Sequence, residues 1–215
     1  MKTDSYQKKI IAIAIILTVA VTAFALWMNT TKFEFRYYVF PAVLIFLPLV
    51  FNSSFRPQNI LKPSKKGFKL FFYVTITVIV LYPPAFFIYW ITLKNQVFMI
   101  PGTEEVLKAV LKGLTAVAVA AIPEEFFFRG YLQEHVFKGL ERKFIKVVTL
   151  KNLITSILFG VVHAVAFLDI TRAATFFPSL LFGLFCEKSE GKIFYSILFH
   201  VISNILAFVL WTFIK

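Results

Sequence analysis

The residues best suited to chemistry lie in one short stretch, where two glutamates and an arginine interrupt an apolar run: Pro123-Glu124-Glu125-Phe126-Phe127-Phe128-Arg129-Gly130. An ionisable side chain inside a bilayer costs about 2.5–3.5 kcal/mol, so neighbouring carboxylates in such a run need partners and a function. In a helix, Glu125 and Arg129 share one face, which permits an ion pair, whereas Glu124 is turned about 100° away. We therefore expect the arginine to hold Glu125 and to leave Glu124 free for chemistry.

Three more polar side chains lie in later apolar stretches at helical spacing. His163 follows Phe159 by four residues, and His200 precedes Asn204 by four residues. Because polar groups that face lipid are penalised, we expect these faces to point into a helical bundle and to meet the carboxylate pair. The Phe159 ring is expected to pack beside the His163 imidazole, and Gly160 to allow a neighbouring helix to approach closely.

The chemistry that suits this set is hydrolysis. Glu124 is the candidate general base for a bound water molecule, with His163 orienting or activating the same water. His200 and Asn204 can both donate hydrogen bonds and together stabilise a developing oxyanion on a peptide carbonyl. A catalytic zinc ion bound by Glu124, His163 and His200 is the alternative. The usual His-Glu-x-x-His zinc signature is absent, so we favour water activation without a required metal and keep zinc as the alternative cofactor.

Composition identifies the environment that must position these groups. Hydrophobic residues make up 59% of the 215 residues and the mean hydropathy is +0.80, whereas soluble domains are about 45–50% apolar. We therefore expect an integral membrane protein. The net charge of +12 comes from short Lys and Arg clusters between apolar stretches, which fits membrane topology and contact with the lipid bilayer better than nucleic acid. The single Cys186 cannot form an internal disulfide and is expected to be a small apolar filler.

Seven apolar stretches approach the length of about 20 residues that crosses a bilayer. They run from Ile10 to Met28, Tyr37 to Phe51, Leu70 to Leu93, Leu114 to Phe128, Leu153 to Leu168, Ala173 to Cys186 and Ile193 to Ile214. An amphipathic lead-in, Glu104 to Lys112, precedes the fourth, and Pro83-Pro84 is expected to break or kink the third. A cleaved signal peptide is the alternative interpretation of the first stretch.

The sequence thus predicts an all-α, multi-pass transmembrane helical bundle of about seven spans, with a catalytic cavity among the last four. We expect one integral membrane domain over residues 1–215, in which residues 1–100 are accessory spans and residues 104–215 form the catalytic core. With Arg129 left out, 15 Lys and Arg lie on the N-terminal side of the membrane and 7 on the other. The positive-inside rule then predicts a cell-membrane protein with its N-terminus in the cytoplasm, its C-terminus outside, and a site facing the cytoplasmic half.

Three motifs in order on separate spans resemble a known family of intramembrane proteases. Glu124-Glu125-x-x-x-Arg129-Gly130, Phe159-x-x-x-His163 and His200-x-x-x-Asn204 are similar to the motifs that CAAX-processing enzymes share with bacteriocin-processing and self-immunity proteins, the CPBP or Abi family. Phe182-Gly183-Leu184 and Tyr195-Ser196-Ile197-Leu198 also resemble the spacing before the last motif. The resemblance covers about Leu114 to Ala207.

The resemblance implies an intramembrane endopeptidase with its site in a cavity among core helices. Carried over by position, Glu124 and His163 would activate water, His200 and Asn204 would form the oxyanion hole, and Glu125 with Arg129 would hold the helix ends. The family has been described both as metalloendopeptidases and as glutamic proteases, and its substrates are membrane-associated or lipidated peptides and proteins.

Two other functional classes remain open from the residues alone. One is a non-catalytic immunity protein that binds a peptide, and the other is a proton-coupled transporter, which also keeps ionisable groups within the membrane. Close approach of His163 to Glu124 would favour the protease. His135, just beyond the first motif, is expected at the surface.

Overall fold

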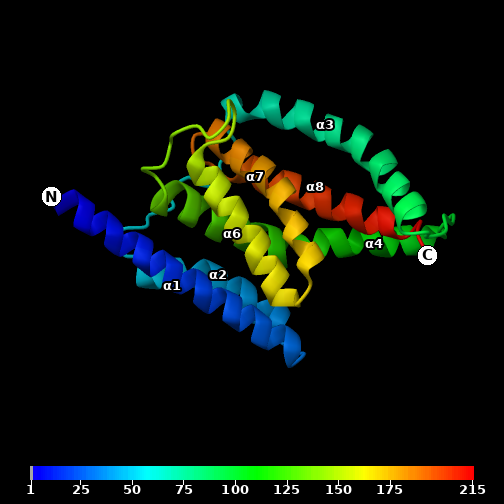
Figure 1. The fold of residues 1–215 in the computed structure, drawn as a ribbon, viewed down its shortest axis with the longest axis horizontal. Coiled ribbons are helices and arrows are strands. Elements are labelled where there is room, and N and C mark those ends of the chain that lie inside the picture. Colours follow the sequence, from blue (N-terminus) through cyan, green and yellow to red (C-terminus); the bar gives the residue numbers. More distant parts are fainter. Residues whose placement is uncertain (1) are drawn as a thin grey trace.

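The structure is a computed structural model that describes residues 2–215, with side chains described from Lys8 onward (Figure 1). Over this range every regular element is helical, and extended pairing is limited to two isolated bridges, Phe98 with Ile214 and Lys143 with Thr149. The helices are α1 Lys2–Thr30, α2 Arg36–Phe51, α3 Lys65–Ile88 with η1 Tyr89–Leu93, α4 Thr103–Ala116, η2 Val117–Ala121, α5 Ile122–Glu125, η3 Phe126–Val136, α6 Leu150–Phe167, η4 Ile170–Thr175, α7 Phe176–Lys188 and α8 Phe194–Trp211.

Five helical segments are long and apolar enough to cross a membrane. They are Lys8–Thr30, Lys65–Leu93, Thr103–Val136, Leu150–Phe167 and Phe194–Trp211, and α2 is a shorter apolar helix. Together with α7, these segments correspond to the seven predicted spans. The prediction of an all-α, multi-pass membrane bundle is therefore confirmed.

The fourth span differs from its prediction in length. Elements α4, η2, α5 and η3 join into one helix of 34 residues, Thr103–Val136, so the helix continues beyond the motif instead of ending at Phe128. Its turns around Pro123 are wide: η2 and η3 are π-helical. The proline ring at position 123 would clash with the Val119 carbonyl in a regular α-helix, and a wider turn relieves that contact.

The proline pair of the third span does not break its helix. Pro83 and Pro84 lie inside α3, which continues to Ile88 and then through the π-helical η1 to Leu93. Of the two predicted outcomes, a break or a kink, the break is therefore absent. The helix follows a curved path instead (Figure 1), because the ring of an internal proline displaces the carbonyl one turn earlier without ending the helix.

The helices are arranged around a central group formed by α5, η3, α6, α7 and α8. Helices α1 and α2 lie together on one side, with α1 against α6 and α2 against α5 and η3, while α3 arches over α7 and α8 on the other (Figure 1). Helices α1, α2, α3, η3, α6, α7 and α8 contribute to one hydrophobic cluster, which includes Leu17 from α1, Leu44 from α2, Phe71 from α3 and Phe185 from α7. The first three helices are thus packed onto the core.

Candidate active site

The predicted ion pair is present and fully buried. Arg129 Nε donates to Glu125 Oε2 at 3.3 Å, and neither side chain is exposed to solvent. Their spacing of four residues places them one turn apart, as the sequence indicated. Removing such charges from water is costly, so the structure must supply further hydrogen bonds to both groups.

Two residues that the sequence analysis missed complete the surroundings of Arg129. Its guanidinium also donates to Gln133 Oε1 at 3.3 Å and to Ser179 Oγ on α7. Gln133 in turn donates to the Gly183 carbonyl at 3.0 Å. A signal was available for Gln133, which follows Arg129 by four residues, whereas nothing in the sequence links Ser179 to Arg129. These bonds tie η3 to α7.

The second oxygen of Glu125 orients His200. His200 Nδ1 lies 3.1 Å from Glu125 Oε1, and the Phe182 ring stacks on the imidazole with ring centroids 4.7 Å apart and an interplanar angle of 14°. An ionised carboxylate can only accept hydrogen bonds, so Nδ1 carries the hydrogen. His200 Nε2 is therefore turned toward the other glutamate.

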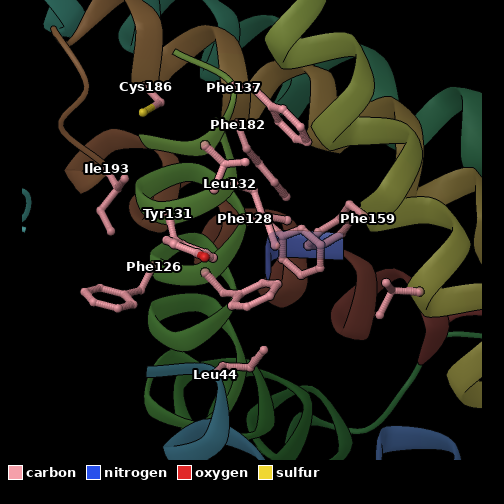
Figure 2. Packing of buried hydrophobic residues seen from close by; sticks show 14 of the residues in the cluster. Leu44, Phe126, Phe128, Tyr131, Leu132, Phe137, Phe159, Phe182, Cys186 and Ile193 are labelled. Atoms are coloured by element: carbon pink, nitrogen blue, oxygen red, sulfur yellow. The ribbon is translucent and has the colours of Figure 1, made fainter. Parts of the chain in front are cut away.

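His163 is held by its own helix. Its Nδ1 lies 2.9 Å from the Phe159 carbonyl oxygen, so this nitrogen also carries the hydrogen, and the two rings are 4.3 Å apart at their centroids. Phe159 packs in turn against Phe128 of the motif, at 4.9 Å, on the side of η3 opposite Phe126 (Figure 2). Packing and one backbone hydrogen bond thus fix the direction of His163 Nε2.

Both histidines present Nε2 to Glu124. Glu124 Oε2 lies 3.8 Å from His163 Nε2 and 3.9 Å from His200 Nε2. This oxygen is buried and has no hydrogen-bond partner among the residues that the structure describes. An acceptor in such a position is costly unless something else binds it, so the arrangement supplies a place for a small polar molecule.

Glu124 and His163 line a cavity of about 260 Å³. The core wall includes Phe128 from η3 and Val162 from α6, and the opposite wall comes from α1 and α2. The remaining residues of the wall include Ala25, Met28, Asn29, Arg36, Tyr37, Phe40 and Leu44. The helices expected to be accessory therefore enclose the candidate site.

Asn204 lies on another cavity. It follows His200 by one turn of α8 and lines a largely apolar space of about 760 Å³ between α3, α7 and α8, together with Phe182 and Phe199. Since Phe182 stacks on His200, the two cavities approach the site from different sides. The role of Asn204 in an oxyanion hole stays a prediction.

A zinc ion does not fit the side chains as they lie. Two ligands bound to one tetrahedral zinc at about 2.0–2.1 Å are about 3.3 Å apart, and the separations of Glu124 from His163 and His200 are longer. No group of three His, Cys, Asp or Glu side chains within the described part of the chain has the geometry to hold a metal ion.

His135 is not a simple surface residue, which corrects its predicted position. Its Nε2 lies 3.1 Å from Ser54 Oγ and 3.3 Å from Asn52 Nδ2, and its ring packs against Phe55. The segment between α2 and α3 folds over the end of η3 and half-buries the imidazole. A single histidine in the sequence gave no sign of this distant loop.

One comparison with known proteins identifies the family. The family model for Rce1-like proteins, type II CAAX prenyl endopeptidase Rce1-like, matches residues 96–206. The chain belongs to this family. The Rce1-like match runs from before α4 into α8 and includes all three motifs, which confirms the resemblance to CAAX-processing proteases. At the level of the family, the chain is a CAAX-type intramembrane endopeptidase. No curated protein matches the chain, and no solved structure does.

Proposed function

We propose that the protein hydrolyses a peptide bond of a membrane-associated or lipidated substrate with water activated by Glu124. One observation supports this most directly: a buried carboxylate oxygen without a hydrogen-bond partner among the described residues faces the Nε2 atoms of two histidines. Separations of 3.8 and 3.9 Å are too long for direct hydrogen bonds. A water molecule bound to Glu124 Oε2 would be in reach of both imidazoles.

His163 is suited to orient the attacking water. Because Nδ1 donates to the Phe159 carbonyl, Nε2 of the neutral ring is an acceptor. A water held between Glu124 and His163 then donates one hydrogen to each, which leaves its lone pair directed toward the substrate carbonyl. Glu124 takes the proton as the oxygen attacks, and returns it to the leaving amine when the tetrahedral intermediate collapses.

His200 is suited to stabilise charge. Its Nδ1 donates to Glu125, so Nε2 can donate to an oxyanion when the ring is an imidazolium. The Glu125 carboxylate that accepts from His200 also accepts from Arg129, so the ring is held with Nε2 directed into the site. Asn204, one turn later, would supply the second donor from the side of the larger cavity.

The test is cleavage of membrane-associated peptides by purified protein in lipid vesicles, with Glu124→Gln beside the wild type. We expect the wild type to cleave and the variant to bind without cleaving. Binding without cleavage by the wild type would favour a peptide-binding immunity protein. Proton flux across the vesicle membrane that is coupled to a solute, and lost in Glu124→Gln, would favour a transporter instead.

Orientation in the cell membrane is the remaining part of this proposal. The first cavity lies at the end of α1 farthest from the N-terminus, beside Asn29 and Arg36. A cytoplasmic N-terminus would place this end outside, whereas the sequence also predicted a site that faces the cytoplasm. If the substrate enters through this cavity, the predicted cytoplasmic N-terminus and the predicted cytoplasmic site cannot both be right. Labelling of single cysteines at positions 32 and 141 from either side of the membrane decides between them.

A further inference from the structure

We propose that Arg36 binds the C-terminal carboxylate of the peptide substrate, so that the enzyme recognises a free chain end a few residues beyond the scissile bond. The proposal rests on the proposed peptidase function. It assigns substrate recognition to α1 and α2, which lie outside the part of the chain that the family model matches, residues 96–206.

Arg36 shares a cavity with the candidate base. Arg36 is the first residue of α2 and lines the same cavity as Glu124 and His163. The rest of that lining consists of apolar residues, Asn29 and Tyr37. A substrate bound in this cavity would therefore meet the candidate base at one place and a guanidinium at another.

The guanidinium of Arg36 contacts the neighbouring tyrosine side chain. Its guanidinium donates to the Tyr37 hydroxyl at 3.1 Å and lies 4.9 Å from the centroid of that ring. None of the ion pairs among the described residues joins Arg36 to a carboxylate. Asn29, by contrast, is already engaged by the Ala166 carbonyl at 2.8 Å. Arg36 thus remains able to form a two-pronged contact with an anionic group, for which a carboxylate has the matching geometry.

The length of the cavity wall along α2 can be compared with the length of an extended peptide. Leu44, which also lines the cavity, is eight residues after Arg36 on α2, and eight residues of helix rise about 12 Å. An extended peptide advances about 3.3–3.6 Å per residue, so three residues span roughly 10 Å. A peptide tail of about three residues that runs along this wall from Leu44 would place its terminal carboxylate near Arg36.

The experiment uses two S-farnesylcysteine peptides of the same sequence with three residues after the cysteine, one ending in a free carboxylate and one in an amide. Cleavage is measured in phosphatidylcholine vesicles for the wild type, Arg36→Gln and a control, Lys32→Gln. Lys32 lies in the same α1–α2 connection, is exposed and does not line the cavity. A charge-assisted hydrogen bond predicts a preference for the acid of about tenfold to a hundredfold in kcat/KM.

We expect this preference in the wild type and in Lys32→Gln, and its loss in Arg36→Gln with amide cleavage unchanged. A preference that survives in Arg36→Gln overturns the proposal. So does equal loss of acid and amide cleavage, which would make Arg36 a packing residue. The guanidinium could also bind a lipid phosphate. Activity that is indifferent to the peptide end but rises with phosphatidylglycerol only when Arg36 is present would assign that ligand instead.

A binding measurement separates this proposal from the proposed function. Anisotropy of fluorescent acid and amide peptides is recorded with Glu124→Gln protein, with and without Arg36→Gln. Tighter binding of the acid that depends on Arg36 supports carboxylate recognition even if the wild type cleaves nothing, an outcome that would refute the peptidase assignment alone. Cleavage by the wild type with equal binding of both peptides would refute carboxylate recognition alone.

Discussion

His163 and His200 present the same ring nitrogen to one oxygen of Glu124, but their other nitrogens donate to different kinds of acceptor. His163 Nδ1 meets a neutral backbone carbonyl at 2.9 Å, and His200 Nδ1 meets the Glu125 carboxylate at 3.1 Å. A carbonyl fixes the tautomer of a neutral ring, whereas a carboxylate also stabilises an imidazolium. The two rings therefore differ in the acceptor that holds Nδ1, a neutral carbonyl for His163 and a carboxylate for His200.

This difference predicts two distinct histidine spectra. In protein labelled with ¹⁵N-histidine and reconstituted in lipid, we expect Nδ1 to carry a hydrogen in both rings, with the more deshielded N–H proton on His200, because its acceptor is a carboxylate and that of His163 is a backbone carbonyl. His163→Gln and His200→Gln assign the signals, and His135 serves as the internal reference. Replacement of Glu125 by Gln should move the Nδ1–H signal of His200 toward that of His163, because the acceptor is then a neutral amide oxygen. Equal spectra for the two site histidines would contradict the assigned roles.

Glu124→Gln should reduce peptide cleavage by at least about 10²–10⁴-fold, the usual contribution of a general base. The amide preserves the shape of the side chain but cannot take a proton from water. Its thermal unfolding should stay close to that of the wild type, since Glu124 Oε2 makes no hydrogen bond with a described residue. Glu141→Gln, in the exposed segment after η3, is the matched control and should cleave normally. Substantial activity of Glu124→Gln would move the base to another residue.

The sequence predicted the site better than its surroundings, for physical reasons. The Glu125–Arg129 pair follows from helical spacing alone, because a buried charge needs a partner within reach. His163 and His200 were expected to lie near Glu124 because polar groups that face lipid are penalised. Ser179 could not be assigned to Arg129, since no periodicity in the chain fixes which face of α7 meets η3.

The sequence also did not indicate which residues line the cavity. Residues 1–100 were expected to be accessory because they carry no motif, yet Arg36 and Asn29 line the cavity of the candidate base. The contact of α1 with α6 depends on tertiary packing, which spacing within either helix does not report. The same holds for Pro83-Pro84, where packing of α3 over α7 and α8 keeps a helix intact that local preference would break.

Arg129→Ala should unfold the protein more easily as well as inactivate it. The substitution removes hydrogen bonds to Glu125, Gln133 and Ser179 and leaves a buried carboxylate with one remaining partner. Breaking a buried pair in this way costs about 3–5 kcal/mol of unfolding free energy. Ser179→Ala removes a single bond and should cost about 1–3 kcal/mol.

Thermal unfolding in detergent micelles measures both effects. Arg172→Ala is the control, since this arginine is exposed and its contact with Asp169 is 3.7 Å long, and exposed pairs contribute about 0–1 kcal/mol. An Arg129→Ala variant as stable as the wild type would show that Glu125 does not depend on Arg129 as its partner.

Removal of divalent metals should leave cleavage unchanged within about twofold. The expectation follows from the separations around Glu124, which do not close into a ligand set for zinc. Protein dialysed against a strong zinc chelator is compared with untreated protein, and zinc content is determined by mass spectrometry before and after. Activity that falls with zinc content and returns on addition of zinc would establish the metal mechanism in place of the one proposed here.

Gly160 should tolerate no larger residue, because α6 and the segment before α7 meet there. A Cβ atom at this position would lie 2.8 Å from the Ala173 carbonyl oxygen and 3.2 Å from Phe176 Cβ, and backbone at such a distance must shift. We expect Gly160→Ala to lower the unfolding free energy by about 1–3 kcal/mol and to reduce cleavage, since His163 lies on the same helix one turn later. Gly102→Ala is the control, as a Cβ atom there meets nothing within 4 Å. If both variants unfold at the wild-type temperature, the close approach of these segments is wrong, and with it the fixed direction of His163.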